Sequence, residues 1–165
     1  MSAYDDKTLG RLARQLGAVL VAQDATLTTA ESCTGGFIAK IITDIDGSSQ
    51  WFSSAVVTYS NRAKQRLLGL TDATLQQHGA VSEAVVSVMA ESALQQDGAS
   101  YAVAVSGIAG PAGGSEDKPV GTVWIGWAAA AQPTHSRRLV FDGDRDAVRR
   151  QTVVAALEGV LELAQ

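Results

Sequence analysis

Cysteine and long apolar runs are both scarce in this sequence. Its single cysteine, Cys33, excludes an internal disulfide and is typical of proteins from a reducing compartment. No apolar run approaches the roughly 20 residues that a membrane-spanning helix needs. The N-terminus, Met1-Ser2-Ala3-Tyr4-Asp5-Asp6, is polar and acidic and does not resemble a signal peptide. We therefore expect a cytoplasmic protein with no membrane partner.

Basic residues are also fewer than acidic ones. The chain carries 13 lysines and arginines against 17 aspartates and glutamates, a net charge of −4. A general nucleic-acid binder needs a basic face that releases counterions, so we expect no nucleic-acid partner, whereas a small anionic ligand needs only a few local arginines. The length of 165 residues, with 46% hydrophobic and 18% charged residues, predicts one domain spanning residues 1–165.

Residues that commonly bind metals are few. The two histidines, His78 and His135, and the single cysteine show no spacing that is typical of a metal site. Glu31, Asp44 and Asp46 could bind a hard cation, but a solvated or helix-capping role is favoured for them. We therefore expect no metal.

Helical and β-strand patterns alternate along the chain. Apolar residues spaced three and four apart predict helices, and β-branched or continuous apolar runs predict strands. Helices are predicted over residues 7–22, from 37, over 61–68, 72–78, 82–96 and 145–163, and strands over 25–30, 55–59, 101–106, 122–130 and 136–141, with a loop at 46–49. This order is typical of an α/β fold, here a three-layer α/β/α sandwich with a mixed, mostly parallel sheet of about five strands, of which the last two are antiparallel.

The segment 28–36, with the sequence TTAESCTGG, joins a predicted strand to a predicted helix. The first N–H groups of a helix lack intrahelical partners and attract anions, and glycines let a ligand approach the backbone. One hypothesis is a nucleophile beside an oxyanion or phosphate cradle, in which Thr34, Gly35 and Gly36 contact the substrate. The other is a tight turn with Ser32 or Thr34 as the helix N-cap.

Three predicted strand ends place polar residues at one edge of the sheet. The turn at Ser32, the strand end at Tyr59 and the loop that begins at Gly107 all follow carboxyl ends of strands, where α/β proteins bind ligands. Loop 107–121 matches neither a Walker loop nor a common dinucleotide fingerprint. It is either a backbone nest for an anion, with Gly107 and Gly110 near the ligand, or a plain flexible loop.

A serine nucleophile needs a base, and the histidines are poorly placed to supply one. His78 precedes a glycine at a helix end and His135 lies in a hairpin connection, so neither follows a strand end. Lys64 lies one helical turn after Tyr59, which adds a second proton-transferring hydroxyl.

A set of serine, tyrosine and lysine requires a neutral lysine. Lowering the lysine pKa by about 3 from roughly 10.4 costs about 4 kcal/mol, which burial or a nearby cation such as Arg62 would have to supply. From spacing alone, a solvated Lys64 and a packed Tyr59 are favoured over this set.

Two further residues have chemistry that suits this edge of the sheet. Cys33 is a rival nucleophile if a helix N-terminus lowers the pKa of its thiol, or else a small buried residue. Arg145 begins the last helix, where an arginine does nothing for the dipole but suits a phosphate. Arg149 and Arg150 are expected on a solvated face.

Six blocks of the sequence together resemble the CinA carboxyl-terminal domain family, whose stand-alone members are nicotinamide-nucleotide amidohydrolases. The blocks are TAESCTGG at 29–36, VTYSN at 57–61, GAVS at 79–82, SGIAGP at 106–111, KPVGTV at 118–123 and GDR at 143–145. Longer family members carry an additional amino-terminal domain that resembles molybdopterin-binding proteins. We expect this chain to lack that domain and the pyrophosphatase activity linked to it.

The resemblance implies hydrolysis of the carboxamide of nicotinamide mononucleotide to nicotinate mononucleotide and ammonia, in pyridine nucleotide recycling. It implies Ser32 as nucleophile with Tyr59 and Lys64 as its partners, no metal or organic cofactor, and a homo-oligomer, with a dimer favoured. Helix-end and loop chemistry assigns the ribose phosphate to Arg145 and loop 107–114. The alternative is a non-catalytic nucleotide-binding module that regulates a partner.

Overall fold

A five-stranded sheet forms the centre of the computed structural model, which describes residues 4–165. Residues 1–3, which include part of the polar N-terminus expected not to be a signal peptide, lie outside the described residues. The strands are β1 (Leu27–Glu31), β2 (Phe52–Val57), β3 (Tyr101–Gly107), β4 (Thr122–Ala129) and β5 (His135–Val140), in the spatial order β2-β1-β3-β4-β5. β1 pairs in parallel with β2 and β3, whereas β4 is antiparallel to both β3 and β5. The expected mixed sheet is confirmed.

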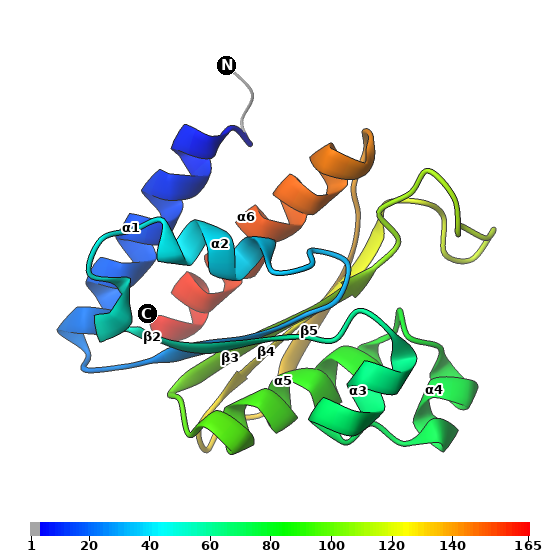
Figure 1. Ribbon diagram of the computed structural model, residues 1–165, viewed down its shortest axis with the longest axis horizontal. Coiled ribbons are helices and arrows are strands. Elements are labelled where there is room, and N and C mark those ends of the chain that lie inside the picture. The colour runs from blue at the N-terminus through cyan, green and yellow to red at the C-terminus, as the bar shows by residue number, and fades with distance from the viewer. Residues whose placement is uncertain (1–3) are drawn as a thin grey trace.

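Helices cover both faces of this sheet (Figure 1). The structure has α1 (Asp6–Ala22), α2 (Phe37–Thr43), α3 (Asn61–Leu68), α4 (Asp72–His78), α5 (Glu83–Asp97) and α6 (Arg145–Ala164), with a short 3₁₀ helix at Ser48–Gln50. Helices α1, α2 and α6 lie on one face, and α3, α4 and α5 lie on the other. The three layers expected from the sequence are therefore present.

Burial on both faces of the sheet explains the strand sequences. All five residues of β1 are buried, and so are the five central residues of β3, which do not alternate in polarity. On α1 the predicted apolar face is formed by Leu9, Leu12, Leu16 and Leu20, which are at most 6% exposed. These leucines belong to the core between the sheet and α1, α2 and α6.

Several helices begin at a serine, threonine or aspartate that caps the first turn with its side chain. The side chains of Ser60, Thr71, Ser82 and Asp144 each accept a hydrogen bond from a backbone N–H three residues later, at the starts of α3, α4, α5 and α6. The caps of α3 and α6 determine where Lys64 and Arg145 project from the fold.

Two strand boundaries differ from the sequence prediction in ways that affect the site. β1 continues to Glu31, because its parallel pairing with β3 extends to the pair Glu31 and Val105. β2 begins at Phe52 and ends at Val57, so Tyr59 lies beyond the strand rather than at its last position. The predicted loop 46–49 includes the start of the 3₁₀ helix.

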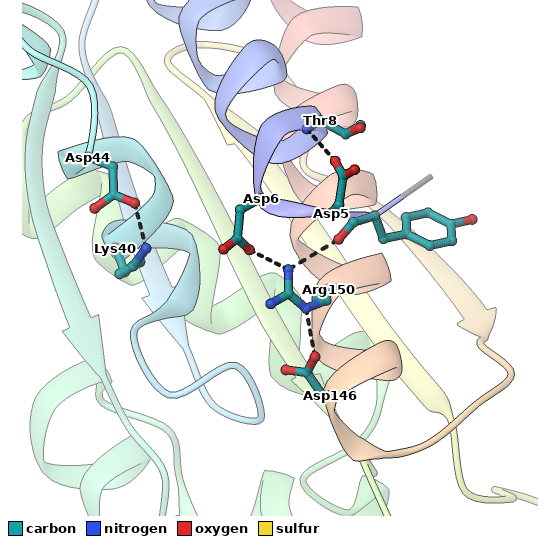
Figure 2. Close-up of polar contacts among 8 residues, drawn as sticks. Asp5, Asp6, Thr8, Lys40, Asp44, Asp146 and Arg150 are labelled. Carbon is teal, nitrogen blue, oxygen red and sulfur yellow. Dashed lines mark hydrogen bonds and ion pairs between the residues drawn. The ribbon is translucent and has the colours of Figure 1, made fainter. Parts of the chain in front are cut away.

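Arg150 ties the start of α1 to α6 (Figure 2). Its guanidinium donates to Asp6 Oδ1 and to Asp146 Oδ2, both at 2.6 Å, and to the carbonyl of Tyr4 at 3.2 Å. Arg150 is therefore partly buried, at 26% side-chain exposure, in a network at the surface whose two carboxylates are themselves exposed. Figure 2 also shows a separate surface pair at the end of α2, in which Lys40 contacts the C-cap residue Asp44. Within residues 4–165, no helix is long and apolar enough to cross a membrane.

Candidate active site

The side chains of Ser32 and Lys64 meet at the carboxyl end of β1. Ser32 directly follows the last residue of β1, and Lys64 projects from the first turn of α3. Lys64 Nζ lies 2.9 Å from Ser32 Oγ and donates to the carbonyl oxygen of Thr58 at 2.8 Å. Lys64 is only 1% exposed and Ser32 only 7% exposed. The arrangement places an amine in direct contact with a serine hydroxyl in a poorly solvated place.

Burial lowers the pKa of Lys64 below its ordinary value of 10.5, because the charged ammonium loses solvation. Within residues 4–165, Lys64 has no carboxylate partner that would oppose this effect through an ion pair. Arg62, suggested as a cation that depresses this pKa, is exposed and is not a cause of the shift. The preference for a solvated lysine, drawn from spacing, was wrong.

Tyr59 and Arg145 form the rim of the same site. The Tyr59 side chain is exposed, and its hydroxyl accepts a hydrogen bond from Arg145 Nη2 at 2.8 Å. Arg145 Nη1 donates to the carbonyl oxygen of Gly110 at 2.9 Å. Among the described residues, Arg145 is the only hydrogen-bond partner of the Tyr59 hydroxyl. Tyr59 is therefore brought to the site without a hydrogen bond to Ser32 or Lys64.

These side chains share one cleft of about 260 Å³. Its lining comprises Ser32, Cys33, Tyr59, Asn61, Lys64, Ala80, Val81, Ser106, Gly107, Ala109 and Arg145. Of the residues assigned to the site from the sequence, Ser32, Tyr59, Lys64, Gly107 and Arg145 line this cleft. Thr34, Gly35, Gly36 and Gly110 do not line it.

The start of α2 is capped from inside the protein by Glu31. Its Oε1 accepts hydrogen bonds from the Thr34 hydroxyl at 2.6 Å and from the backbone N–H groups of Gly36 and Ile38 at 3.2 and 2.9 Å. Its Oε2 accepts one from the N–H of Ala39 at 3.0 Å. Glu31 is fully buried. A carboxylate of the protein itself thus occupies the anion-attracting end of this helix.

This cap engages groups of the substrate cradle predicted at residues 34–36. The Thr34 hydroxyl is buried against Glu31, and the N–H of Gly35 donates to the Ser32 carbonyl at 3.0 Å. Gly35 and Gly36 have φ angles of 58° and 96°, so they are needed for the turn itself. Gly35 and Gly36 therefore offer no free N–H to a ligand, and at Thr34 only the backbone N–H is left, because the hydroxyl is taken by Glu31.

Two backbone N–H groups beside Ser32 are still available. Within residues 4–165, the N–H groups of Cys33 and Thr34 make no hydrogen bond to another residue, whereas that of Ser32 donates to the Val105 carbonyl at 3.1 Å. They directly follow Ser32 in the chain. These two amides are the best candidates for stabilising negative charge next to Ser32 Oγ.

Cys33 is not an activated thiol. Burial raises its pKa to about 12, because the thiolate would lose its solvation. Cys33 is 6% exposed and belongs to the hydrophobic core, as the alternative interpretation of a small buried residue proposed. The two histidines lie outside the site, since neither His78 nor His135 lines the cleft. Within residues 4–165, no group of three or more His, Cys, Asp or Glu side chains could hold a metal ion.

Three residues near the site were not assigned a role from the sequence. Glu31 had been considered only as a cation ligand or a cap. Ser106 lines the cleft and donates to the Ala80 carbonyl at 2.8 Å. Arg149 donates to the Thr34 carbonyl at 2.8 Å and lies over the ring of Phe37, so it is not on a solvated face as expected. Ser106 lies at the end of a predicted strand, and a capping role was already favoured for Glu31, so these two positions gave a signal in the sequence, whereas Arg149 gave none.

Loop 107–121 is held at both ends. The N–H of Gly121 donates to the Ile108 carbonyl at 2.7 Å, and Lys118 Nζ donates to the carbonyl of His78 at 3.1 Å. A Cβ atom on Gly107 would lie 2.6 Å from Val123 Cγ2, so close packing against β4 requires this glycine. These contacts place the start of the loop, with the Gly110 carbonyl, beside Arg145.

Comparisons with known proteins agree on one family. The model of the CinA C-terminal domain matches residues 9–164. A protein named nicotinamide-nucleotide amidohydrolase PncC from Escherichia coli (strain K12) is 58% identical over 153 residues, covering 93% of this chain and 93% of that protein. A protein of the same name from Pseudomonas putida is 55% identical over 152 residues, covering 92% of this chain and 94% of that protein.

A solved structure has the same fold over almost its whole length. It is the crystal structure of the competence/damage inducible protein CihA from Agrobacterium tumefaciens, with a TM-score of 0.93 and 41% sequence identity. The match covers 98% of this chain and 97% of that one.

Proposed function

The chain belongs to the CinA C-terminal domain family, and we propose that it hydrolyses the carboxamide of nicotinamide mononucleotide to nicotinate mononucleotide and ammonia. The family resemblance seen in the six sequence blocks is thereby confirmed. Relatives more than half identical over nearly the whole chain bear the name nicotinamide-nucleotide amidohydrolase. The observation that carries the proposal is the contact of 2.9 Å between Lys64 Nζ and Ser32 Oγ in a buried site.

Lys64 acts as the general base in this proposal. Its neutral amine, oriented by the Thr58 carbonyl, takes the proton of the Ser32 hydroxyl, and Ser32 Oγ attacks the carboxamide carbon. The resulting oxyanion accepts hydrogen bonds from the N–H groups of Cys33 and Thr34, each worth roughly 3 kcal/mol. The direct contact between amine and hydroxyl makes a relay through Tyr59 unnecessary for this step.

The leaving group departs with the proton that the base has taken. Lys64 returns this proton to the amide nitrogen, and the C–N bond breaks to release ammonia. Tyr59, which the family resemblance implies as a further partner of Ser32, lies at the rim of the same cleft. Water then attacks the acyl group on Ser32 while Lys64 accepts a proton from the water. Transfer of that proton to Ser32 Oγ restores the serine and releases the carboxylic acid product.

The pH dependence of the reaction follows from the state of Lys64. The ammonium form cannot accept the serine proton, so kcat/KM should rise with pH and level off once Lys64 is neutral. Because burial lowers the pKa of Lys64, we expect the midpoint of this rise to lie below 10.5. A pH profile of ammonia release measures it. A rate that falls as pH rises through this range would contradict the base role.

Arg145 is proposed to bind the phosphate of the nucleotide, together with the start of loop 107–121. Its guanidinium lies on the rim of the cleft, held by Tyr59 and Gly110, and still has N–H groups to offer. Gly107 lines the cleft beside it, whereas Gly110 acts through its carbonyl contact with Arg145. The buried Glu31 at the start of α2 makes that helix end a poor alternative for an anion.

Replacing Arg145 by alanine should therefore raise KM for nicotinamide mononucleotide far more than it lowers kcat. In wild type, the Arg145 guanidinium is proposed to contact the phosphate equally in the ground state and in the transition state, so its removal weakens binding rather than the chemical step. Initial-rate kinetics measure the effect, and Arg137→Ala on the outer strand β5 provides a control that keeps the wild-type KM. An unchanged KM in Arg145→Ala would move the phosphate elsewhere.

The alternative function, a nucleotide-binding regulatory module, also predicts binding of nicotinamide mononucleotide. Only the enzyme predicts ammonia, so a panel of pyridine nucleotides and ribosides with ammonia as the readout separates the two. The proposed enzyme releases ammonia from nicotinamide mononucleotide. No release above the buffer value at high enzyme concentration would contradict it.

We further propose that residues 1–165 act as one amidohydrolase domain, in a cytoplasmic homo-oligomer, with a dimer favoured. The single cysteine suits a reducing compartment. The oligomer is an expectation from the family resemblance.

A further inference from the structure

We propose that Glu31 is a positioning residue that holds the turn carrying the nucleophile and the two oxyanion donors. It does so without contact with the substrate. This inference rests on the proposed amidohydrolase function, and it concerns a residue that lies immediately before Ser32 in the chain.

Four hydrogen bonds link Glu31 to the segment that follows the nucleophile. They come from the Thr34 hydroxyl and from the N–H groups of Gly36, Ile38 and Ala39, at distances between 2.6 and 3.2 Å. Every one of these groups donates, and both carboxyl oxygens accept, which is the pattern of an ionised carboxylate. Glu31 therefore replaces the missing side-chain cap of α2, whose N-cap residue Gly36 has none.

The turn between Glu31 and α2 is held from two sides. On one side, the N–H of Ser32 donates to the Val105 carbonyl in β3. On the other side, Glu31 holds Thr34 and Gly36. Between these anchors lie the N–H groups of Cys33 and Thr34. Their direction relative to Ser32 Oγ depends on the anchors, because Gly35 and Gly36 alone would leave this backbone free to move.

A position so close to the reacting atoms makes small displacements costly. Displacing a catalytic group by about 1 Å can lower a rate by roughly a hundredfold. Glutamine at position 31 has the same shape but must turn an NH₂ group toward one of the two sets of donors. Glu31→Gln therefore loses either the hydrogen bond from the Ala39 N–H or the hydrogen bonds that Oε1 accepts in wild type. The turn between residue 31 and α2 then shifts.

The experiment compares wild type and Glu31→Gln by kcat, KM and the pH profile of ammonia release from nicotinamide mononucleotide, with folding checked by circular dichroism and thermal melting. We expect kcat to fall by roughly tenfold to a hundredfold, with KM within about threefold of wild type. The midpoint of the pH profile should stay in place, because burial and not Glu31 depresses the pKa of Lys64.

Thr152→Val is the matched control for the loss of a buried polar contact. Thr152 is fully buried and donates to the Val148 carbonyl within α6, outside the cleft. It should lower the melting temperature without changing kcat. If Glu31 is only a structural cap, Glu31→Gln will behave in the same way, and the proposal is overturned. A shifted pH midpoint in Glu31→Gln would also overturn it, since Glu31 would then act through the charge of Lys64.

A pair of variants at Thr34 decides the question if Glu31→Gln does not fold. Thr34→Val removes one donor to Glu31 and keeps the backbone N–H, whereas Thr34→Ser keeps the hydroxyl. We expect a several-fold loss of kcat in Thr34→Val and rescue in Thr34→Ser. Equal kcat in both variants and wild type would contradict the positioning role. Inactivity of the wild type would instead refute the amidohydrolase function, so the two failures are distinguishable.

Discussion

Replacing Lys64 by methionine should abolish ammonia release from nicotinamide mononucleotide and leave the fold intact. Methionine has a similar length and is apolar, so it fits a position that is 1% exposed and already costs the lysine its solvation. It removes the only base in contact with Ser32 Oγ among the described residues. General-base catalysis contributes about a hundredfold or more, so the loss should be at least that large. Steady-state ammonia release, normalised to folded protein, measures it.

Two further lysine variants sharpen this test. Lys64→Arg keeps a long cationic side chain but cannot supply a neutral amine, so it should be as inactive as Lys64→Met. Lys40→Met removes an exposed lysine that pairs with Asp44 on α2, and it should keep the wild-type rate. If Lys64→Met retained more than about a tenth of the wild-type rate, Lys64 would not be the base.

Replacing Ser32 by alanine should remove turnover by roughly 10⁴-fold or more, because the covalent step has no other nucleophile. Cys33→Ala should keep most of the rate. Its thiol has a pKa of about 12, so almost no thiolate exists at neutral pH, and alanine keeps the backbone N–H proposed as an oxyanion donor. Ammonia release from both variants, beside wild type, decides between the two neighbouring side chains.

The opposite pattern would reverse the assignment. An inactive Cys33→Ala beside an active Ser32→Ala would make the thiol the nucleophile. Intact-protein mass spectrometry after rapid quenching gives a second readout, in which an added nicotinate mononucleotide acyl group is expected on wild type and absent from Ser32→Ala.

The sequence predicted the order and type of the elements because their signals are local. The spacing of apolar residues in α1 and the caps Ser82 and Asp144 lie within a few residues of the helices they define. Strand ends were less accurate, because β1 extends to Glu31 through pairing with β3, about 70 residues away in the chain. Periodicity carries no information about such a partner.

The candidate site was likewise predicted from local signals only in part. The carboxyl ends of the strands correctly indicated where Ser32, Tyr59 and the loop at Gly107 converge. Spacing could not indicate that Lys64 is buried against Ser32, since that depends on how α3 packs on the sheet. The resemblance to the family, and not spacing, selected the lysine.

Glu31 shows how far a local signal reaches. The sequence favoured a solvated or helix-capping role for this glutamate, and it does cap α2, but the helix end beside it was also considered as a phosphate cradle. Only the fold shows that the carboxylate itself fills that end. This replaces an expected ligand contact at Gly35 and Gly36 with an internal one.

The most direct test of the central claim measures ammonia and nicotinate mononucleotide together, with nicotinamide mononucleotide as substrate, for wild type and Ser32→Ala. Binding of the substrate is measured on the same preparations by calorimetry. We expect equal amounts of the two products from wild type, whereas Ser32→Ala should bind the substrate and form neither product. Binding without ammonia from wild type would contradict the account and would favour a regulatory nucleotide-binding module.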